Sequence, residues 1–275
     1  MAAVAAKPGL PFKISPLGAY AAFFLVFIYG PVLLLPLFSF SDSQYVALPI
    51  TGFTTQWYEQ MFQADQLQGA LFNSLKVATV TSIVATALAM MAALALTRYR
   101  VPGRSVISGT IILPLVIPGI ILGVSILVVM VQVLGVTPSL WSVGAGHLLI
   151  CTPFGMLILI SRLEGFDRSL EEASLDLGET RFVTFFRVTL PLALPGVVAS
   201  ILTTFTLSFD EFILAFFLAG VEPTLPVYIW SQLRFPQRLP SVLALGSIIL
   251  VVSFAVIAFA EWYRRRDVAT GAKPV

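Results

Sequence analysis

The sequence predicts an all-α membrane protein with six transmembrane helices. Its 275 residues are 58% hydrophobic and only 11% charged, and the mean hydropathy is +0.95. Ordinary soluble domains carry about 25% charged residues, and a soluble protein of this size needs far more polar surface to cover its core. The composition therefore excludes a water-soluble globular protein, a disordered chain and a nucleic-acid-binding protein.

Six charge-poor apolar windows locate the predicted helices. A helix needs about 20 apolar residues to cross a hydrocarbon core of about 30 Å. The windows are continuously apolar, which excludes the alternating pattern of a membrane β-barrel. They place the spans at about residues 19–40, 71–97, 105–134, 139–161, 190–218 and 239–262. Pro114 and Pro118 predict a kink within the third span.

The first span and the division between the third and fourth spans do not follow from hydropathy alone. The first window, Ala19–Phe40, is too long for a signal-peptide core and no small-residue cleavage site follows it, so we expect a retained span. The stretch 105–161 contains no Asp, Glu, Lys or Arg and is too long for one helix. Helix-breaking residues divide it into the third and fourth spans, namely Gly135, Pro138 and Gly144.

The basic residues predict the orientation. With the N-terminus inside, thirteen of the sixteen Lys and Arg residues lie on the cytoplasmic side, and only Lys76, Arg234 and Arg238 lie on or near the outer side. Cytoplasmic loops carry this excess of positive charge. We therefore expect both termini to be cytoplasmic. The predicted parts are an N-terminus 1–18, a single transmembrane domain 19–262 with a long outer loop 41–70 and a long inner loop 163–187, and a tail 263–275.

Several kinds of chemistry lack their residues in this chain. His147 is the only histidine and Cys151 the only cysteine, which excludes an intrachain disulfide and argues against a metal site with nitrogen and sulfur ligands. A Walker-type phosphate loop needs Gly-Lys-Ser/Thr, and none of the four lysines is followed by serine or threonine. We therefore expect no catalytic residue, no metal and no cofactor on this chain.

The inner loop concentrates charge in an otherwise uncharged protein. Six of the fourteen acidic residues lie in it: Glu164, Asp167, Glu171, Glu172, Asp176 and Glu179. Apolar residues between Leu163 and Leu177 recur at helical spacing, and Gly178 follows them as a helix-terminating glycine. A second short helix then leads into the fifth span. On physical grounds the loop is either a docking surface or a solvated connection, and the pattern leaves both open.

The same loop resembles the EAA signature of ABC-importer permeases. Glu172-Ala173-Ser174, three residues, Gly178, nine residues and Val188-Thr189-Leu190-Pro191 follow the order E-A-A, three, G, nine, I-x-L-P, with serine replacing the second alanine and valine replacing isoleucine. The resemblance implies the type I ABC importer permease fold, with a cytoplasmic coupling helix between spans four and five that docks on an ATP-hydrolysing subunit. By resemblance, the coupling residues are Glu172, Ala173, Ser174, Gly178, Leu190 and Pro191.

Other segments resemble the spermidine/putrescine-type permeases, a polyamine subfamily. These are Gly52-Phe53-Thr54, Trp57-Tyr58, Ser161-Arg162-Leu163, Leu207-Ser208-Phe209-Asp210-Glu211 and residues 224–231. In the outer loop, Trp57 and Tyr58 are either part of an interfacial aromatic belt or a contact for an extracytoplasmic solute-binding protein.

Asp210 and Glu211 are acidic residues inside the predicted fifth span. A helix that starts near Leu190 and rises 1.5 Å per residue brings Asp210 about 30 Å along the span, near its outer mouth. Acids at such depth usually face a bundle interior or a wet cavity. They favour a cation pathway, with Phe209 close by for cation–π contacts. The alternative is a structural ion pair with Lys76, Arg234 or Arg238.

The predicted function is a transport subunit rather than an enzyme. We expect a permease of an ATP-driven importer for a small cationic nitrogenous solute, most consistent with putrescine or spermidine. The resemblance implies a bacterial inner-membrane location within lipid, a second permease subunit in a heterodimer, an ATP-binding subunit dimer that carries ATP and Mg²⁺, and a solute-binding protein. Alternatives are the same importer class carrying an amino-acid-like compound, an opine or ferric ion, a secondary transporter, or an intramembrane enzyme. The transporter alternative lacks visible inverted repeats, and the enzyme lacks a base, nucleophile or metal ligands around His147.

Overall fold

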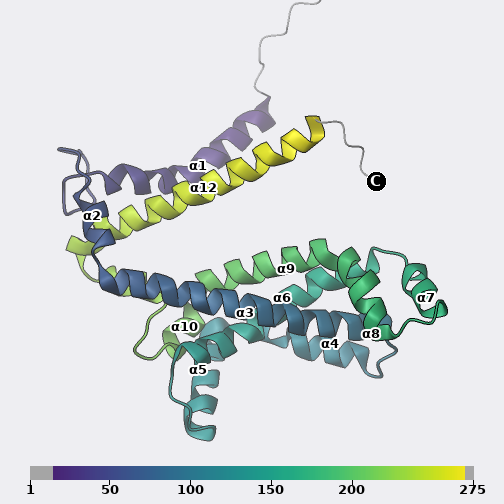
Figure 1. The fold of residues 1–275 in the computed structure, drawn as a ribbon. Helices are drawn as coiled ribbons and strands as arrows, with labels where there is room; N and C mark the ends of the chain where they lie inside the picture. Colours follow the sequence, from purple (N-terminus) through teal and green to yellow (C-terminus); the bar gives the residue numbers. More distant parts are fainter. Residues whose placement is uncertain (1–14, 270–275) are drawn as a thin grey trace, which may run out of the picture. The chain divides into compact units, whose positions relative to one another are not determined.

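A computed structural model describes residues 15–269 of the chain (Figure 1). The residues in it form helices and connecting loops, with one isolated bridge between Ser41 and Phe53. This confirms the predicted all-α class. The helices are α1 Pro16–Ser39, α2 Gln56–Phe62, α3 Asp65–Arg98, α4 Arg104–Ile112, η1 Leu113–Leu115, α5 Gly119–Val128, η2 Val129–Val133, α6 Leu140–Glu164, α7 Ser169–Asp176, α8 Arg181–Thr184, η3 Phe185–Thr189, α9 Leu190–Asp210, α10 Ile213–Leu218, α11 Leu225–Gln232, η4 Pro236–Arg238 and α12 Leu239–Ala269.

The chain divides into two compact units. The first consists of residues up to Gln63 together with those from Gln232 onward, and the second is Ala64–Ser231. In the first unit, α1 and α12 run side by side (Figure 1). Most of the predicted N-terminus 1–18 lies outside the described residues, and α1 begins at Pro16. Of the predicted tail 263–275, residues 263–269 continue α12 and the remainder lies outside the described residues.

Three long helices, α3, α6 and α9, form the core of the second unit. Small residues allow them to approach closely, as is usual where helices pack inside a bilayer. On α9 the buried small residues recur every fourth position: Gly196, Ser200, Thr204 and Ser208. Gly155 of α6 lies where the three helices meet, because an added Cβ there would be 2.7 Å from Ser200 Oγ of α9 and 3.1 Å from Ala89 Cβ of α3.

The third predicted span, 105–134, is broken rather than merely kinked. The segments Arg104–Leu115 and Gly119–Val133 meet at 99°, and Pro118 stands at the break, where it precedes α5. A proline cannot supply the N–H that would continue the preceding helix. Gly119 and Gly123 lie in α5, and both glycines face α10.

The broken pair crosses the bundle once. Arg98 at the end of α3 donates to the Leu163 carbonyl near the end of α6, and Arg104 at the start of α4 lies 3.6 Å from Glu164. At the opposite end, Ser142 near the start of α6 donates to the Leu218 carbonyl. The chain therefore enters α4 at one end and begins α6 at the other. Among residues 15–269, five helices are long and apolar enough to span a membrane, and the broken pair makes six when it counts as one span.

The fifth predicted span, 190–218, has different limits in the structure. The apolar helix starts at Arg181, passes through a π-helical turn at Phe185–Thr189 and ends at Asp210. Glu211 has an extended backbone and α10 begins two residues later. The hydropathy pattern missed this break because apolar residues continue on both sides of it.

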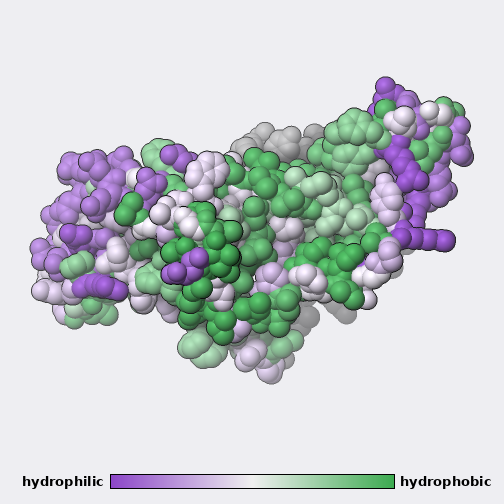
Figure 2. Space-filling view, turned by 90° about the horizontal axis from the view of Figure 1, so that it is seen from below, coloured by the Kyte–Doolittle hydropathy of each residue, from purple (hydrophilic) through white to green (hydrophobic). Residues whose placement is uncertain are grey.

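Large apolar side chains cover the outside of the long helices. Val80, Ile83, Ile120 and Leu202 are each at least half exposed in the isolated chain. Figure 2 shows apolar residues over the middle of the face in view and hydrophilic residues gathered toward both ends, one of which carries α7. Exposed apolar area of this extent requires lipid or another protein to cover it.

Candidate functional site

Helix α7 lies in the inner loop at one end of the second unit. The Asp167 carboxylate accepts a hydrogen bond of 3.0 Å from the Ser169 backbone N–H, which holds the pKa of that carboxyl below its usual range. Glu171 and Glu172 occupy the first turn, where the helix dipole favours negative charge. The predicted helix from Leu163 is in fact split, because α6 continues to Glu164 and α7 starts at Ser169.

Gly178 terminates α7 in the left-handed conformation that the sequence predicts. Its φ is +88°. The Gly178 N–H bonds to the Leu175 carbonyl at 2.9 Å, and the Glu179 N–H bonds to the Ser174 carbonyl at 3.2 Å. These two bonds define a Schellman motif, which satisfies carbonyls left free at the helix end.

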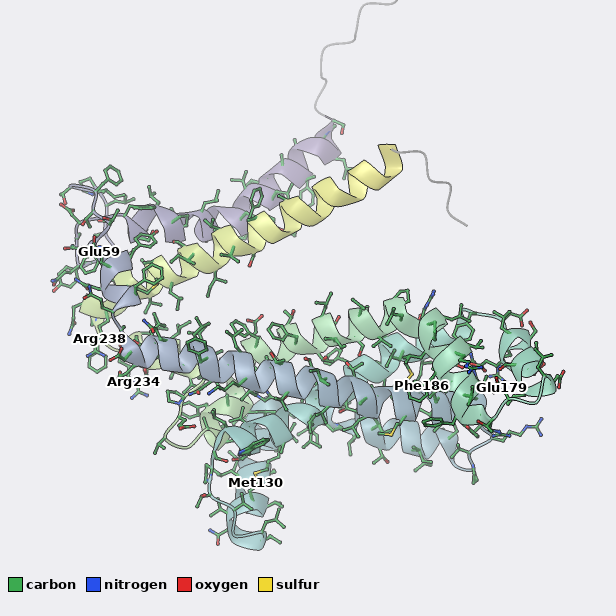
Figure 3. All side chains as sticks on the ribbon, in the orientation of Figure 1. Glu59, Met130, Glu179, Phe186, Arg234 and Arg238 are labelled. Carbon is green, nitrogen blue, oxygen red and sulfur yellow. The ribbon has the colours of Figure 1, made fainter. Side chains whose placement is uncertain are left out.

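The predicted coupling residues divide into exposed and anchored positions. Glu172, Ala173 and Gly178 are exposed, whereas Ser174 is half-buried and its hydroxyl lies 2.9 Å from Thr184 Oγ1. Leu190 and Pro191 open α9 directly behind this region. Exposed apolar side chains surround them, namely Leu177, Phe182 and Phe186. Figure 3 labels Glu179 and Phe186 at this end of the unit.

The residue that fixes α7 in place is Glu171, which sequence reasoning did not select. Glu171 Oε2 lies 2.8 Å from Arg98 Nε, and Glu171 Oε1 accepts a 2.8 Å hydrogen bond from the Thr189 hydroxyl. The two charged side chains are only 10% and 15% exposed. Glu171 and Glu172 are adjacent on a helix and point about 100° apart, so one faces inward and the other faces solvent.

A cavity of about 550 Å³ opens between the end of α3 and the α7–α8 segment. Charged and aromatic residues line it, among them Arg98, Tyr99, Arg168, Glu172, Arg181 and Phe182. Arg168 donates to the Thr97 carbonyl, and the Arg181 guanidinium lies 5.4 Å from the centre of the Tyr99 ring. This end of the unit therefore combines exposed apolar side chains with a charged hollow.

Asp210 and Glu211 lie at the opposite end and differ in their surroundings. Glu211 Oε1 accepts a 3.0 Å hydrogen bond from the Leu214 N–H and so caps α10. Asp210 ends α9, is exposed, and makes no side-chain hydrogen bond or ion pair with the described side chains of the second unit. Within that unit, neither acid pairs with Lys76, one of the three basic residues considered as partners in the sequence analysis.

Aromatic rings line this end of the unit. Phe209 stacks on Phe205 with ring centres 5.9 Å apart. Phe212, which follows Glu211, lies 5.5 Å from the Trp230 ring and 5.6 Å from the Phe216 ring. The break after α9 thus brings an unpaired carboxylate and several aromatic residues into one short segment.

His147 is a packed histidine in the core of the second unit. Its side chain is fully buried and Nδ1 lies 2.8 Å from the Ser208 hydroxyl of α9. Further along the same face of α6, the Cys151 thiol lies 3.6 Å from the Thr204 carbonyl. Both contacts join α6 to α9.

The aromatic pair of the outer loop is turned inward in the first unit. Trp57 is 4% exposed, and its indole N–H donates a 2.6 Å hydrogen bond to the Ser41 carbonyl. The Tyr58 hydroxyl lies 2.7 Å from Ser39 Oγ. These contacts hold α2 against the end of α1. They give both residues a structural role. Other aromatic residues of this loop are exposed, namely Tyr45, Phe53 and Phe62.

Comparisons with known proteins agree with this architecture. Residues 85–266 match the family described as binding-protein-dependent transport system inner membrane component. The chain therefore belongs to that family of membrane-spanning transport subunits.

The relatives include individual permeases of known systems. The chain is 34% identical to the spermidine/putrescine transport system permease protein PotC of Haemophilus influenzae, over 88% of this chain and 93% of that protein. It is 33% identical to the putrescine transport system permease protein PotI of Escherichia coli, over 86% of each chain. A solved bacterial alginate ABC transporter, in complex with a periplasmic protein that carries an alginate pentasaccharide, shares the fold, with a TM-score of 0.69, 19% identity, and coverage of 91% of this chain and 92% of that one.

Proposed function

We propose that this protein is the permease subunit of an ATP-driven polyamine importer in a bacterial inner membrane. The observation that carries the proposal is the one-third identity to spermidine/putrescine and putrescine permeases along nearly the whole chain. In this assembly a second permease subunit completes a heterodimer, a dimer of ATP-binding subunits holds ATP and Mg²⁺, and a solute-binding protein delivers the substrate from outside. Both chain termini are cytoplasmic.

The α7 end supports the energy-coupling role. Glu172 and Ala173 are exposed while Glu171 and Ser174 hold the helix to its neighbours. Leu177, Phe182 and Phe186 are exposed apolar side chains in the same part of the chain. A compact surface of this kind suits a helix that inserts into a groove on a partner. Hydrolysis on the partner would move α7, and α7 would move the core helices.

The α9 break supports a cationic substrate. An ammonium group that leaves water loses hydration, and a carboxylate such as Asp210, which has no partner among the described side chains of its own unit, offsets that loss. Phe209, Phe212 and Trp230 add ring faces that attract cations by about 0.5–2 kcal/mol each. Glu211 contributes less, because its carboxylate already caps α10.

The experiment co-expresses the chain with the subunits encoded beside its gene and follows two readouts. An ATPase subunit should copurify at a stoichiometric level in detergent, and its absence would remove the importer assignment. In cells that lack other polyamine uptake, Asp210→Asn should lower spermidine uptake about tenfold at equal membrane abundance, which corresponds to the loss of one charged contact of about 1.4 kcal/mol. Glu222→Gln, at an exposed acid in the turn after α10, is the matched control. Equal uptake by both variants would take Asp210 out of the pathway.

A further inference from the structure

Helix α7 is attached to the rest of the second unit mainly by polar contacts. None of its eight residues is buried, so apolar packing contributes little to its position. Its neighbours are α8 and η3, the segments that lead into α9. A helix held in this way depends on a few directional bonds.

Besides the contact between the Ser174 and Thr184 hydroxyls, the polar contacts of α7 centre on Glu171. Its two carboxylate oxygens bind different elements: Oε2 takes the Arg98 guanidinium from the end of α3, and Oε1 takes the Thr189 hydroxyl from the end of η3. Each of these contacts measures 2.8 Å. One side chain in the first turn of α7 therefore ties this helix to α3 and to the start of α9.

Arg98 extends the connection to the third core helix. Its Nη2 donates a 2.9 Å hydrogen bond to the Leu163 carbonyl of α6, and its guanidinium carbon lies 4.9 Å from the centre of the Phe166 ring. Three contacts therefore join α7 to the core helices. The ion pair with Arg98 reaches the end of α3, the Thr189 hydroxyl reaches the start of α9, and Arg98 in turn binds the Leu163 carbonyl near the end of α6. The neighbouring acid, Glu172, takes no part and remains exposed for a partner.

We propose that the Arg98–Glu171 ion pair is the positioning element that passes movement of α7 to the three core helices. The inference rests on the proposed function, because it presupposes that an ATPase subunit displaces α7. Glu172 and Glu171 then have separate tasks: Glu172 faces the ATPase, and Glu171 faces the membrane helices. Because Arg98 and Glu171 are mostly shielded from water, their attraction is less screened than that of an exposed pair and resists separation.

A second ion pair at the same end of the unit provides a control for the loss of a carboxylate. Arg104 and Glu164 form a second ion pair at this end, 3.6 Å apart, with both side chains 56% exposed. This pair joins α4 to α6 and does not involve α7. Exposed pairs of this kind contribute little, so Glu164→Gln reports the effect of losing a carboxylate near the coupling end without loss of the proposed connection.

The test uses the complete importer in proteoliposomes and measures copurified ATPase, ATP hydrolysis and polyamine uptake. Glu171→Gln should retain the ATPase and its hydrolysis while uptake per ATP hydrolysed falls about tenfold, within the usual range of coupling between sites. Thr189→Val, which removes one of the two Glu171 contacts, should give a smaller loss in the same direction. The reversal Arg98→Glu with Glu171→Arg should restore part of the ratio, since it re-forms the ion pair without the Leu163 contact.

The outcomes separate this inference from the proposed function. If the unaltered chain retains no ATPase, the proposed function fails. If the ATPase is retained and the uptake per ATP hydrolysed is the same in Glu171→Gln as in Glu164→Gln, the inference is wrong. It is also wrong if ATPase binding, hydrolysis and uptake all fall in proportion, since that result indicates lost docking. If Glu171→Gln does not reach the membrane, Thr189→Val decides: normal uptake per ATP overturns the inference, and a reduced ratio supports it.

Discussion

Gly155 gives the sharpest stability prediction, because its surroundings can be compared with another glycine on the same helix. In Gly155→Ala the new Cβ would lie 2.7 Å from Ser200 Oγ and 3.1 Å from Ala89 Cβ. At Gly144, also on α6, the nearest atom to an added Cβ is Thr81 Oγ1 at 3.7 Å, an ordinary contact. The same substitution therefore meets a crowded site in one case and an open one in the other.

The expected cost at Gly155 follows from two effects. Overpacking of a close-packed interior costs about 1–3 kcal/mol. Ser200 must also turn away, which breaks its 2.9 Å hydrogen bond to Thr86, and such interhelical bonds in membranes contribute about 0.6 kcal/mol on average. We expect a total of about 1.5–3.5 kcal/mol, which at about 2–4 °C per kcal/mol is a fall in melting temperature of roughly 3–14 °C.

The assay is thermal unfolding of the purified protein in one detergent at one heating rate. Gly144→Ala should melt close to the unaltered protein. Adding Ser200→Ala to Gly155→Ala removes the atom in closest contact and should recover part of the loss, leaving the 3.1 Å contact with Ala89. Equal melting temperatures for Gly155→Ala and Gly144→Ala would refute the three-helix crossing at this position.

Two further predictions concern single contacts. In Gly178→Ala the new Cβ would have no heavy atom within 4 Å, but the residue would keep a φ of +88°. We therefore expect backbone strain alone to destabilise the protein, by about 1–2 kcal/mol, and to lower its melting temperature. The control is Gly109→Ala, which adds a Cβ in open space within a helix and should not lower the melting temperature. Trp57→Phe removes the indole donor to the Ser41 carbonyl and should cost about 1–3 kcal/mol, measured in the same way. A melting temperature unchanged by Trp57→Phe would contradict the inward placement of this ring.

The long helices were predictable because hydropathy reports length and apolar content directly. The end of α7 was also predictable, because glycine is the residue that most often adopts the positive φ found just after a helix, and Gly178 lies at that position. The direction of a helix after a break has no such signature. Pro114 and Pro118 predicted a kink in the third span, but the 99° turn depends on how α5 packs against α10.

The roles of individual side chains were harder to predict than the helices. Glu171 and Glu172 have the same chemistry, and only the rotation of α7 decides which of them meets Arg98. The two acids at 210 and 211 presented the same problem, since the end of α9 makes Glu211 a cap and leaves Asp210 exposed. Trp57 was expected at an interface or a partner surface, and the Ser41 carbonyl instead holds it inside. Such assignments depend on contacts between residues far apart in the sequence.

Uptake of radiolabelled spermidine into proteoliposomes that contain the assembled importer and its solute-binding protein tests the central proposal most directly. We predict uptake that requires ATP inside the vesicles and that excess putrescine reduces. ATP hydrolysis without spermidine uptake, combined with ATP-dependent uptake of an anionic or uncharged solute, would contradict the proposal.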